Sequence, residues 1–487
     1  MTIGAKKASE LLAQLPPVNR AEAASALEKE LHSFDRKIIV LDDDPTGVQT
    51  VHGVSVYTDW TLETMLRGFQ EEQPIFFILT NSRAFVAGET EAAHREIARH
   101  AEEASKALNK PYIIVSRGDS TLRGHYPLET ETLRSTIEAM SGESFDGEVI
   151  VPFFKEGGRL TIDNVHYVQY GDELVPAGET EFAKDRTFGY TESDLRRWVE
   201  EKSGGVYQAA DCLSISLERL RALDVDGITE QLLQVTGFNK VIVNAADDAD
   251  VRVFAAALVR AIKQGKRFLF RSAASFTKII GGVSDRPLLT REELLPDEGG
   301  NGAGSSCGGL ILVGSHVKKT TEQLERLKAC DFISFIEFDV HLVADPAAFE
   351  AETDRVIAET DRALGEGRTV AVYTRRERLD LGEGKREEEL KQSVKISDAV
   401  TSIVQRLKTR PRYIVAKGGI TSSDIGTKGL GVKRAVVVGQ IKPGVPVWLT
   451  GEESRFPGIP YIIFPGNVGT QETLKETVEL LEGQQGE

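Results

Sequence analysis

The chain has 487 residues, of which 40% are hydrophobic and 28% charged, and it carries a formal net charge of −16. This length predicts two or three domains, because single hydrophobic cores stop growing beyond about 250–300 residues. The acidic balance disfavours a nonspecific nucleic-acid or anionic-membrane surface, and three scattered cysteines suggest neither a disulfide framework nor a zinc site. Since no stretch resembles a secretory signal or a membrane span, we expect a cytoplasmic protein without nucleic-acid or membrane partners.

The first 35 residues are predicted to form a helical extension. Segments 8–15 and 20–31 are rich in Ala, Leu and Glu, and Pro16-Pro17 separates them.

Residues 37–50, KIIVLDDDPTGVQT, begin with a short apolar run that leads into Asp42, Asp43 and Asp44. Such a run is typical of a buried strand in a parallel sheet, and ligands of open α/β sheets bind beyond the carboxyl ends of the strands. Three carboxylates at such an end repel one another unless a cation, a polyhydroxy ligand or protonation relieves them. The simpler alternative is an acidic loop in which Asp44 or Thr46 caps the next helix.

Strands and helices then alternate along the first half of the chain. Short repeats of strand, helix and strand with polar loops predict a parallel α/β sheet. The expected strands are 53–57, 75–79, 112–115 and 149–151, and the expected helices are 63–69, 89–108 and 127–140.

Arginine or lysine occurs in three successive loops that follow these strands. Any one such residue is usually just solvated. Because the carboxyl ends of parallel strands share one edge of the sheet, three such loops facing an Asp-rich strand end together indicate an anion-binding cleft. The loops are 80–83 (TNSR), 116–124 (SRGDSTLRG) and 152–159 (PFFKEGGR).

The alternation resumes between residues 207 and 282, and the composition then changes. Pro, Gly, Ser and Asn dominate the second half of 287–307, as is typical of an interdomain connection. We therefore expect a helical extension at 1–35, a first domain at 36–290, a linker at 291–308 and a second domain at 309–487.

The second half also alternates strands and helices, so the predicted fold is two α/β domains with mainly parallel sheets and a cleft between them. Three of its strands end in glycine-containing loops whose free backbone N–H groups suit a phosphate. Glycine after a strand is also ordinary turn chemistry, and the chain has no G-x-x-x-x-G-K-[ST] motif and no G-x-G-x-x-G after its opening strand. The loops are 312–316 (LVGSH), 415–423 (VAKGGITSS) and 463–470 (IFPGNVGT).

Several of these segments together resemble the four-carbon acid sugar kinase family, formerly a domain family of unknown function (DUF1537), over about 37–479. In the first half, residues 43–47 are similar to the family's D-D-F-T-G, 119–124 match D-S-T-L-R-G, and 158–168 resemble G-R-x-T…h-y-V. In the second half, 314–323 are similar to G-S-x-S-x-x-T-x-x-Q, 418–421 stand where the family has G-G-[DE]-T, 443–446 match P-G-V-P, and 465–469 resemble S-G-N-F-G.

The resemblance implies an acid-sugar-binding N-terminal domain and an ATP-binding C-terminal domain that close on each other. The implied reaction transfers the γ-phosphate of ATP to a hydroxyl of a small sugar acid such as threonate, erythronate or 3-oxo-tetronate. Three departures from the family motifs fall on the nucleotide side, where they put nucleotide affinity, metal coordination and the subgroup's substrate in doubt: Ile420, Val317 and Pro465.

Phosphoryl transfer needs an oriented hydroxyl, neutralised phosphate charge and a proton acceptor. We assign the base or hydroxyl-orienting role to Asp43 or Asp44, with Asp119 as a competitor that can instead orient an arginine. The substrate carboxylate is expected at arginines, because a guanidinium binds a carboxylate bidentately. His166 is either a ligand of a substrate hydroxyl or a structural histidine. The predicted substrate-binding set is Arg83, Ser120, Arg123, Gly124, Lys155, Arg159 and His166.

The predicted nucleotide-binding residues are Ser315, Gly418, Gly419, Thr421, Gly444, Gly466 and Asn467. Mg²⁺ is expected to arrive with ATP and to be held largely by phosphates and water, so no dedicated metal ligands are predicted. The expected partners are thus a sugar acid and ATP, and a homodimer is one option for the oligomeric state.

Two other functions stay open. Residues 42–46 read D-x-D-x-T after an apolar strand, the spacing of the aspartyl nucleophile in phosphatases of the haloacid-dehalogenase type. That type also needs a later Lys and a Gly-Asp pair, and residues 244–248 lack the glycine. The third hypothesis is a non-catalytic sensor of a sugar acid or a nucleotide, which the three departures suggest.

Overall fold

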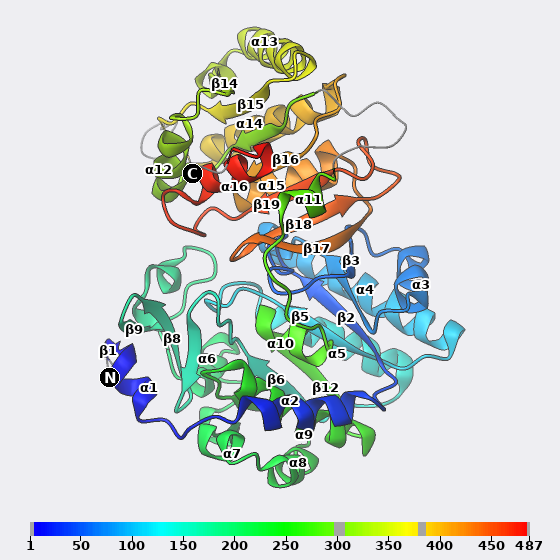
Figure 1. The fold of residues 1–487 in the computed structure, drawn as a ribbon. Coiled ribbons are helices and arrows are strands. Elements are labelled where there is room, and N and C mark those ends of the chain that lie inside the picture. Colours follow the sequence, from blue (N-terminus) through cyan, green and yellow to red (C-terminus); the bar gives the residue numbers. More distant parts are fainter. Residues whose placement is uncertain (1–3, 297–306, 378–385, 485–487) are drawn as a thin grey trace. The chain divides into compact units, whose positions relative to one another are not determined.

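The computed structural model describes residues 4–296, 307–377 and 386–484. The chain forms two compact units, which can be followed by colour in Figure 1. The first unit comprises Met1–Gly47 and Asp59–Asp285, and the second comprises Val48–Thr58 and Arg286–Glu487. Both units are α/β with mainly parallel sheets, which confirms the predicted fold class.

The first unit is built on a parallel sheet in the order β10-β11-β6-β12-β5-β2-β4. Its strands β2 and β4 are buried along their whole length, because continuous apolar runs need cover on both faces. The strands are β2 (Lys37–Asp42), β4 (Ile75–Leu79), β5 (Tyr112–Arg117), β6 (Gly147–Val151), β10 (Leu213–Ile215), β11 (Asn239–Val243) and β12 (Phe268–Ser272).

The helices of the first unit form two groups by their packing. One group is α3 (Leu62–Gln70), α4 (Ala87–Leu108) and α5 (Leu128–Ser141), and the other surrounds α9 (Asp248–Lys263). Helix α9 begins at a capping box between Asp247 and Asp250, which satisfies backbone N–H groups at its start. It packs against α2 (Arg20–Leu31), α7 (Leu217–Arg221), α8 (Val225–Leu233) and α10 (Ala274–Ile280).

A small antiparallel sheet in the first unit was not predicted from the sequence. Its order is β1-β9-β8-β7, with bounds Lys6–Lys7, Glu173–Pro176, Val165–Tyr170 and Arg159–Ile162. Asp163 and Asn164 join β7 to β8 and both have positive φ, at 50° and 67°. Two such residues are typical of a tight hairpin turn, so this dipeptide was the signal that could have revealed the hairpin. The remaining helices of this unit are α1 (Ala8–Ala13) and α6 (Leu195–Lys202).

The second unit contains a mixed sheet in the order β3-β17-β18-β19-β16-β13-β15-β14. The strands from β19 to β14 are parallel, whereas β3, β17, β18 and β19 pair antiparallel. The bounds are β3 (Val54–Tyr57), β13 (Leu310–Val313), β14 (Ile333–Phe338), β15 (Thr369–Thr374), β16 (Ile414–Lys417), β17 (Arg434–Lys442), β18 (Val445–Thr450) and β19 (Pro460–Phe464).

Strand β3 lies far in sequence from the rest of its sheet. The strand expected at 53–57 forms, but it pairs with β17 of the second unit, with Tyr57 opposite Arg434. The Arg434 guanidinium also donates a hydrogen bond of 3.0 Å to the Ser55 hydroxyl. The second unit therefore takes its edge strand from residues that a purely sequential division places in the first domain.

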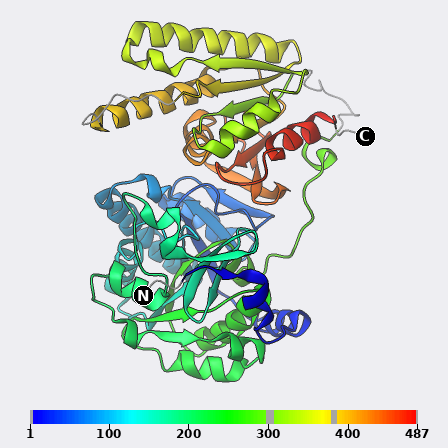
Figure 2. The same cartoon turned by 90° about the vertical axis from the view of Figure 1, so that its left-hand side faces the viewer.

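Helices cover the second sheet around a core that includes Ile311, Val415, Ile462, Phe464 and Leu324. They are α11 (Arg291–Leu294), α12 (Lys318–Leu327), α13 (Pro346–Gly365), α14 (Arg386–Arg406), α15 (Gly419–Asp424) and α16 (Thr473–Glu482). Of the expected linker, residues 297–306 lie outside the described residues, and the short helix α11 packs against α16. Figure 2 shows the helices and strands from a second direction.

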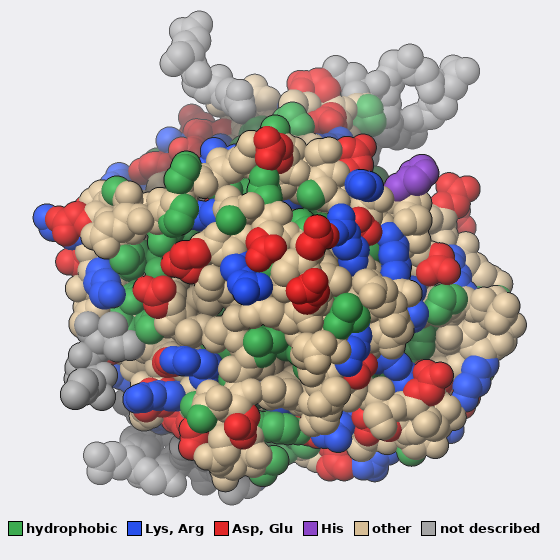
Figure 3. All heavy atoms as spheres, turned by 90° about the horizontal axis from the view of Figure 1, so that it is seen from below, with side chains coloured by type: hydrophobic (Ala, Val, Ile, Leu, Met, Phe, Trp, Pro, Cys, Tyr) green, Lys and Arg blue, Asp and Glu red, His purple; other side chains and the backbone are tan. Residues whose placement is uncertain are grey.

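None of the described helices has the length and apolar character needed to cross a membrane. The face shown in Figure 3 carries acidic and basic side chains interspersed, with hydrophobic side chains scattered among them.

Candidate functional site

In the first unit, the polar segments that follow three parallel strands converge. The register places Asp42 of β2 beside Leu79 of β4 and Arg117 of β5, and Arg117 beside Ser272 of β12. Because these strands are parallel, the segments that leave them start at one edge of the sheet. The predicted convergence of loops 80–83 and 116–124 on the Asp-rich strand end is therefore present.

Arg83 pairs with two of the three aspartates. Its Nε donates to Asp43 Oδ2 at 3.0 Å, its Nη2 reaches the other oxygen of the same carboxylate, and its Nη1 lies 2.6 Å from Asp44 Oδ2. The side chain of Arg83 is 20% exposed and that of Asp43 is 3% exposed, so this fork is partly shielded from water. A planar guanidinium in such a position orders two carboxylates at once.

A second guanidinium, from Arg117, lies among all three aspartates. Its Nη1 is 3.0 Å from Asp42 Oδ1 and 3.4 Å from an oxygen of both Asp43 and Asp44. The predicted loop 116–124 included this residue, but the predicted binding set did not, and in the structure it is the last residue of β5. Its place at the strand end, beside the Asp run in the next strand, was the signal that could have found it.

The Asp44 carboxylate is also held by its own loop. Its Oδ1 accepts hydrogen bonds from the Thr46 backbone N–H at 2.9 Å and from the Thr46 hydroxyl at 2.5 Å. These bonds form a local turn. The alternative that Asp44 or Thr46 caps a helix is wrong, because the element that follows is strand β3.

The three aspartates differ in pKa because their surroundings differ. Burial raises the pKa of Asp42 well above its usual value, although Arg117 opposes the shift, and burial also raises the pKa of Asp43. Burial acts in the same direction on Asp44, but Arg83, Arg117 and the Thr46 hydrogen bonds outweigh it and lower the pKa of that carboxyl. Asp44, whose pKa is lowered, is therefore ionised at neutral pH.

Asp119 is tied to its own loop. Its Oδ2 accepts hydrogen bonds from Arg123 Nε at 2.7 Å and from the Thr121 hydroxyl. Burial would raise the pKa of Asp119, but Arg83 and Arg123 lower it far below its usual value. This geometry favours the alternative in which Asp119 orients an arginine.

His166, on β8, holds the same loop from the small sheet. Its Nε2 is 2.8 Å from the Ser120 carbonyl oxygen and its Nδ1 is 2.9 Å from the Thr161 hydroxyl. Nε2 must donate to the carbonyl, and in the neutral ring Nδ1 then accepts from the Thr161 hydroxyl. The side chain is completely buried, and burial lowers its pKa to about 4. The contacts thus favour the structural alternative for His166.

We predict that His166 makes the protein sensitive to mild acid. Its pKa is about 4 in the folded chain and about 6.5 when unfolded, so the unfolded state binds more protons in that interval and stability falls as pH drops through it. The loss attributable to this residue is about 3 kcal/mol. It is measured as the change in unfolding free energy between pH 7 and pH 4.5 in urea, where His166→Gln should lose less than the wild type. Equal losses in both proteins would contradict the prediction.

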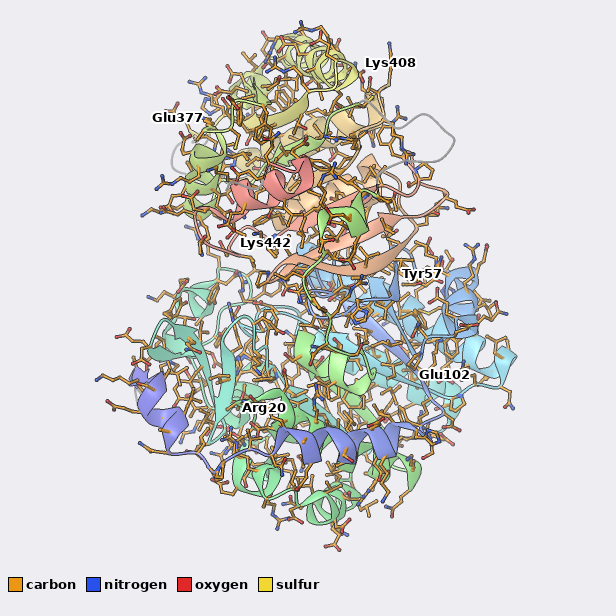
Figure 4. All side chains as sticks on the ribbon, in the orientation of Figure 1. Arg20, Tyr57, Glu102, Glu377, Lys408 and Lys442 are labelled. Carbon is orange, nitrogen blue, oxygen red and sulfur yellow. The ribbon has the colours of Figure 1, made fainter. Side chains whose placement is uncertain are left out.

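The remaining basic residues of the predicted set divide into two groups. Arg123 and Arg159 flank the Phe182 ring, with guanidinium carbons 5.1 and 5.8 Å from its centroid. Lys155 instead has its ammonium 3.4 Å from Asp247 and 3.8 Å from Asp248. Asp247 is also paired with Arg20, which is labelled in Figure 4.

Arg271, the penultimate residue of β12, is a further basic residue of this edge that was not predicted. It is 4% exposed, and its Nη2 donates to the Arg123 carbonyl oxygen at 2.8 Å. A Cβ on Gly118 would lie 1.4 Å from Arg271 Nη1, and one on Gly124 would lie 3.4 Å from both Arg271 Nη2 and Asp43 Oδ2. The two glycines therefore leave the space that this guanidinium occupies beside Asp43.

The second unit has a pocket of about 350 Å³ at the ends of β13 and β16. Four of the predicted nucleotide residues line it, namely Ser315, Gly418, Gly419 and Thr421, together with Thr374 and side chains of α14. Gly418 has φ +123°, and a Cβ there would lie 2.9 Å from Ser315 Cβ, so glycine permits this close approach. The hydroxyl side chains of Ser315, Thr374 and Thr421 and the glycine backbone line this pocket, as suits a phosphate.

The other three predicted nucleotide residues lie outside the lining of this pocket. Gly444 is in the turn between β17 and β18, where its N–H donates to the Gln440 side chain at 2.6 Å. Gly466 lies near the pocket, since a Cβ on it would be 3.5 Å from Ser315 Oγ. The Asn467 carbonyl accepts a hydrogen bond from Lys319 at 3.3 Å.

The three departures from the family motifs all occur at this pocket or at the loop beside it. Ile420 lines the pocket and is 71% exposed, Val317 is 41% exposed, and the Pro465 carbonyl accepts a hydrogen bond from Lys417. No group of three or more His, Cys, Asp or Glu side chains within the described part of the chain is arranged to hold a metal ion.

Comparisons with known proteins cover both units. The model of a sugar-binding N-terminal domain matches residues 38–280, and that of a nucleotide-binding C-terminal domain matches 310–474. A D-erythronate kinase of Heliobacterium modesticaldum is 24% identical over 349 residues, covering 69% of this chain and 70% of that protein.

Two solved structures share the fold over most of the chain. A Haemophilus influenzae protein of the DUF1537 family is 17% identical, with a TM-score of 0.57 over 91% of this chain and 100% of its own. A Salmonella typhimurium protein is also 17% identical, with a TM-score of 0.63 over 90% of this chain and 97% of its own.

Proposed function

Because the chain belongs to the four-carbon acid sugar kinase family, we propose that it transfers the γ-phosphate of ATP to a hydroxyl of a four-carbon sugar acid such as threonate, erythronate or 3-oxo-tetronate. The observation that carries the proposal is the mixed cluster of aspartates and arginines at the strand ends of the sugar-binding unit. A sugar acid needs acceptors for its hydroxyls and cations for its carboxylate, and this cluster offers both.

Asp44 is the candidate that orients and deprotonates the acceptor hydroxyl. It is ionised, and its side chain is 19% exposed, against 3% for Asp43 and 2% for Asp42. Asp43 accepts from two nitrogens of Arg83, which suits a role in holding that guanidinium in place. A positioned acceptor contributes more than a strong base here, since phosphoryl transfer depends mainly on orientation and charge neutralisation.

Arg123 and Arg159 are the proposed ligands of the substrate carboxylate. Both lie against the same ring of Phe182, and Arg159 Nε is buried without a hydrogen-bond partner among the described atoms. An unsatisfied buried donor is costly, and a bound carboxylate would supply the acceptor. Ser120 and Gly124 contribute backbone to the same loop, and Arg83 serves mainly the aspartates.

On the nucleotide side, the pocket lined by Ser315, Gly418, Gly419 and Thr421 is the proposed site of the ATP phosphates. The donor set fits Mg²⁺ that arrives with the nucleotide, because hydroxyls and backbone groups leave the phosphates and water as its main ligands. The ion would offset the phosphate charge during transfer. The cytoplasmic location and a homodimer stay predictions.

The phosphatase alternative finds little support in the geometry. Its nucleophile would be Asp42, which is 1% exposed, and a Cβ on Gly47 would lie 1.6 Å from Asp42 Oδ1. The pKa of Asp42 is also raised by burial, which favours the protonated, non-nucleophilic form.

We expect ADP release that depends on a four-carbon sugar acid. The measurement is coupled-assay ADP production with Mg-ATP across threonate, erythronate and 3-oxo-tetronate stereoisomers, with the corresponding uncharged tetritols as matched controls. Acids should be preferred to tetritols by at least about 100-fold in kcat/KM, because a lost bidentate carboxylate contact is worth about 3 kcal/mol.

Three results would contradict this proposal in different ways. Equal rates with acids and tetritols would show that the protein does not recognise the substrate carboxylate. Phosphate release from sugar phosphates without ATP would revive the phosphatase. Binding of a sugar acid by calorimetry without turnover across the panel would favour the sensor.

A further inference from the structure

Lys417, the last residue of β16, carries a completely buried ammonium group in the second unit. Its Nζ donates to the Pro465 carbonyl oxygen at 2.6 Å and to the Gly466 carbonyl oxygen at 3.3 Å. The same nitrogen lies 4.1 Å from the centroid of the Phe464 ring. All of its polar contacts are therefore uncharged.

This cation has no anionic partner in the described part of the chain. Among those side chains no carboxylate lies within ion-pairing distance of Nζ, and the charged group that influences it is another cation, Lys319 of α12. Burial and Lys319 together lower the pKa of Lys417 to about 7. Lysines are almost never fully buried unless they are paired, and a buried charge without its partner is costly. The position therefore lacks a counter-ion.

Lys417 stands directly behind the loops of the nucleotide pocket. The next residue, Gly418, lines the pocket and approaches Ser315 closely. Gly466, whose carbonyl Lys417 binds, lies against Ser315 from the other side and also accepts from the Thr320 hydroxyl at 3.4 Å. Lys319 holds the neighbouring Asn467 carbonyl. Lys417 thus connects the glycine loops that follow β16 and β19.

We propose that Lys417 is a positioning residue whose missing counter-ion is the phosphate chain of the bound nucleotide. It fixes the Pro465–Gly466 loop by its hydrogen bonds and adds positive potential at the phosphate end of the pocket without touching the nucleotide. In a low-dielectric interior such a charge acts over several ångströms. This inference rests on the proposed function, because it assumes that the pocket holds a nucleoside phosphate.

Nucleotide binding should change the protonation state of Lys417. Phosphates entering the pocket favour the charged form of Lys417, so nucleotide binding takes up a proton near and above neutral pH. The other charged and titratable groups on the surrounding elements are Lys319, Glu322 and Glu325 on α12, Asp424 at the end of α15, Arg376, which donates to the Ser315 carbonyl oxygen, and His316 in the pocket lining. Of these, Lys319 lowers the pKa of Lys417. A His316→Gln background removes the histidine from the measurement.

The test compares adenosine, AMP, ADP and ATP as ligands of the full-length protein by isothermal titration calorimetry. Lys417→Met should weaken ADP binding by about 10- to 100-fold and leave adenosine binding unchanged, whereas Lys417→Arg should restore part of the ADP affinity. The matched control is Lys442→Met in the same unit, labelled in Figure 4, whose ammonium pairs with Glu476 at 3.0 Å. That variant should bind all four ligands like the wild type.

The outcomes separate the inference from the proposed function. Equal weakening of adenosine and ADP by Lys417→Met would mean that the residue only supports packing, and unchanged binding would also overturn the inference. A wild-type protein that binds none of the four ligands would overturn the proposed function itself.

A second measurement needs no variant of Lys417. Proton uptake by the His316→Gln protein is read from calorimetry at pH 8 in buffers of different ionisation enthalpy. Uptake with ADP but not with adenosine is expected, and no uptake with ADP would overturn the proposal even if Lys417→Met failed to fold.

Discussion

Asp44→Asn is expected to lower kcat for the sugar acid by about 10²- to 10⁴-fold, the range that a positioned general base contributes. The substitution keeps the size of the side chain but removes the negative charge that Asp44 carries at neutral pH because its pKa is lowered. It also turns an amide toward Arg83 Nη1, which lies 2.6 Å from Asp44 Oδ2. KM should change less than kcat, because the hydroxyl is one of several groups that bind the substrate. Steady-state kinetics with the best acid of the panel measure both.

The matched control for this variant is Asp42→Asn. Burial raises the pKa of Asp42 well above its usual value, which favours the protonated carboxyl, and a neutral amide of the same size resembles that form. Its kcat should stay within a few-fold of the wild type. Full activity in Asp44→Asn would take Asp44 out of the catalytic role and move attention to Asp43 and Asp119.

Arg117→Met is expected to destabilise the protein by about 3–5 kcal/mol, the usual cost of removing one partner from a buried charge cluster. The side chain of Arg117 is 6% exposed, and its Nη1 lies within 3.4 Å of three carboxylates. Without it, these carboxyl groups lose the cation that they share in a buried setting. The urea midpoint of the full-length protein measures the loss.

The pH dependence of this loss has a definite sign. Removing Arg117 raises the pKa values of the aspartates in the folded state further than in the wild type, so the folded variant binds more protons than the folded wild type. The stability difference between variant and wild type should therefore shrink as pH falls from 7 toward 4. The matched control is Arg95→Met, because Arg95 is 58% exposed and pairs with Glu91 on the helix surface. It should cost less than about 0.5 kcal/mol, and a similar cost for both variants would contradict the prediction.

Much of the parallel sheet could be predicted from local pattern. Runs such as 38–41 and 75–79 are continuously apolar, which a strand buried on both faces requires, and loop residues such as Arg83 and Asp119 could be placed at one edge because parallel strands share their polarity. Arg117 lay in the predicted loop 116–124 but was not assigned to the site, because its contact with the aspartates depends on the register of β5 against β2. Arg271 was missed because it lies inside a strand, where alternation alone does not say which side chain reaches the cluster.

Contacts between distant segments were the part that sequence could not supply. The register of β3 against β17 joins residues far apart in the chain, and no local signal in 53–57 identifies its partner. For His166 the sequence left the ligand role open beside the favoured structural role, and only the contacts of its two ring nitrogens with Ser120 and Thr161 distinguish them. The glycine-containing loops of the second unit could be located because glycine marks them, whereas the burial of the Lys417 ammonium depends on packing.

Because residues 48–58 belong to the second unit, hybrids that exchange one unit between relatives cannot be made with a single junction. The chain leaves the first unit after Gly47, returns at Asp59 and leaves again after Asp285, so the two units are interlaced in sequence. A hybrid joined only at the linker would combine one parent's β3 with the other parent's β17. Exchange of the nucleotide-binding half between relatives therefore has to carry two coding segments, 48–58 and 286–487, and the shorter one begins four residues after Asp44.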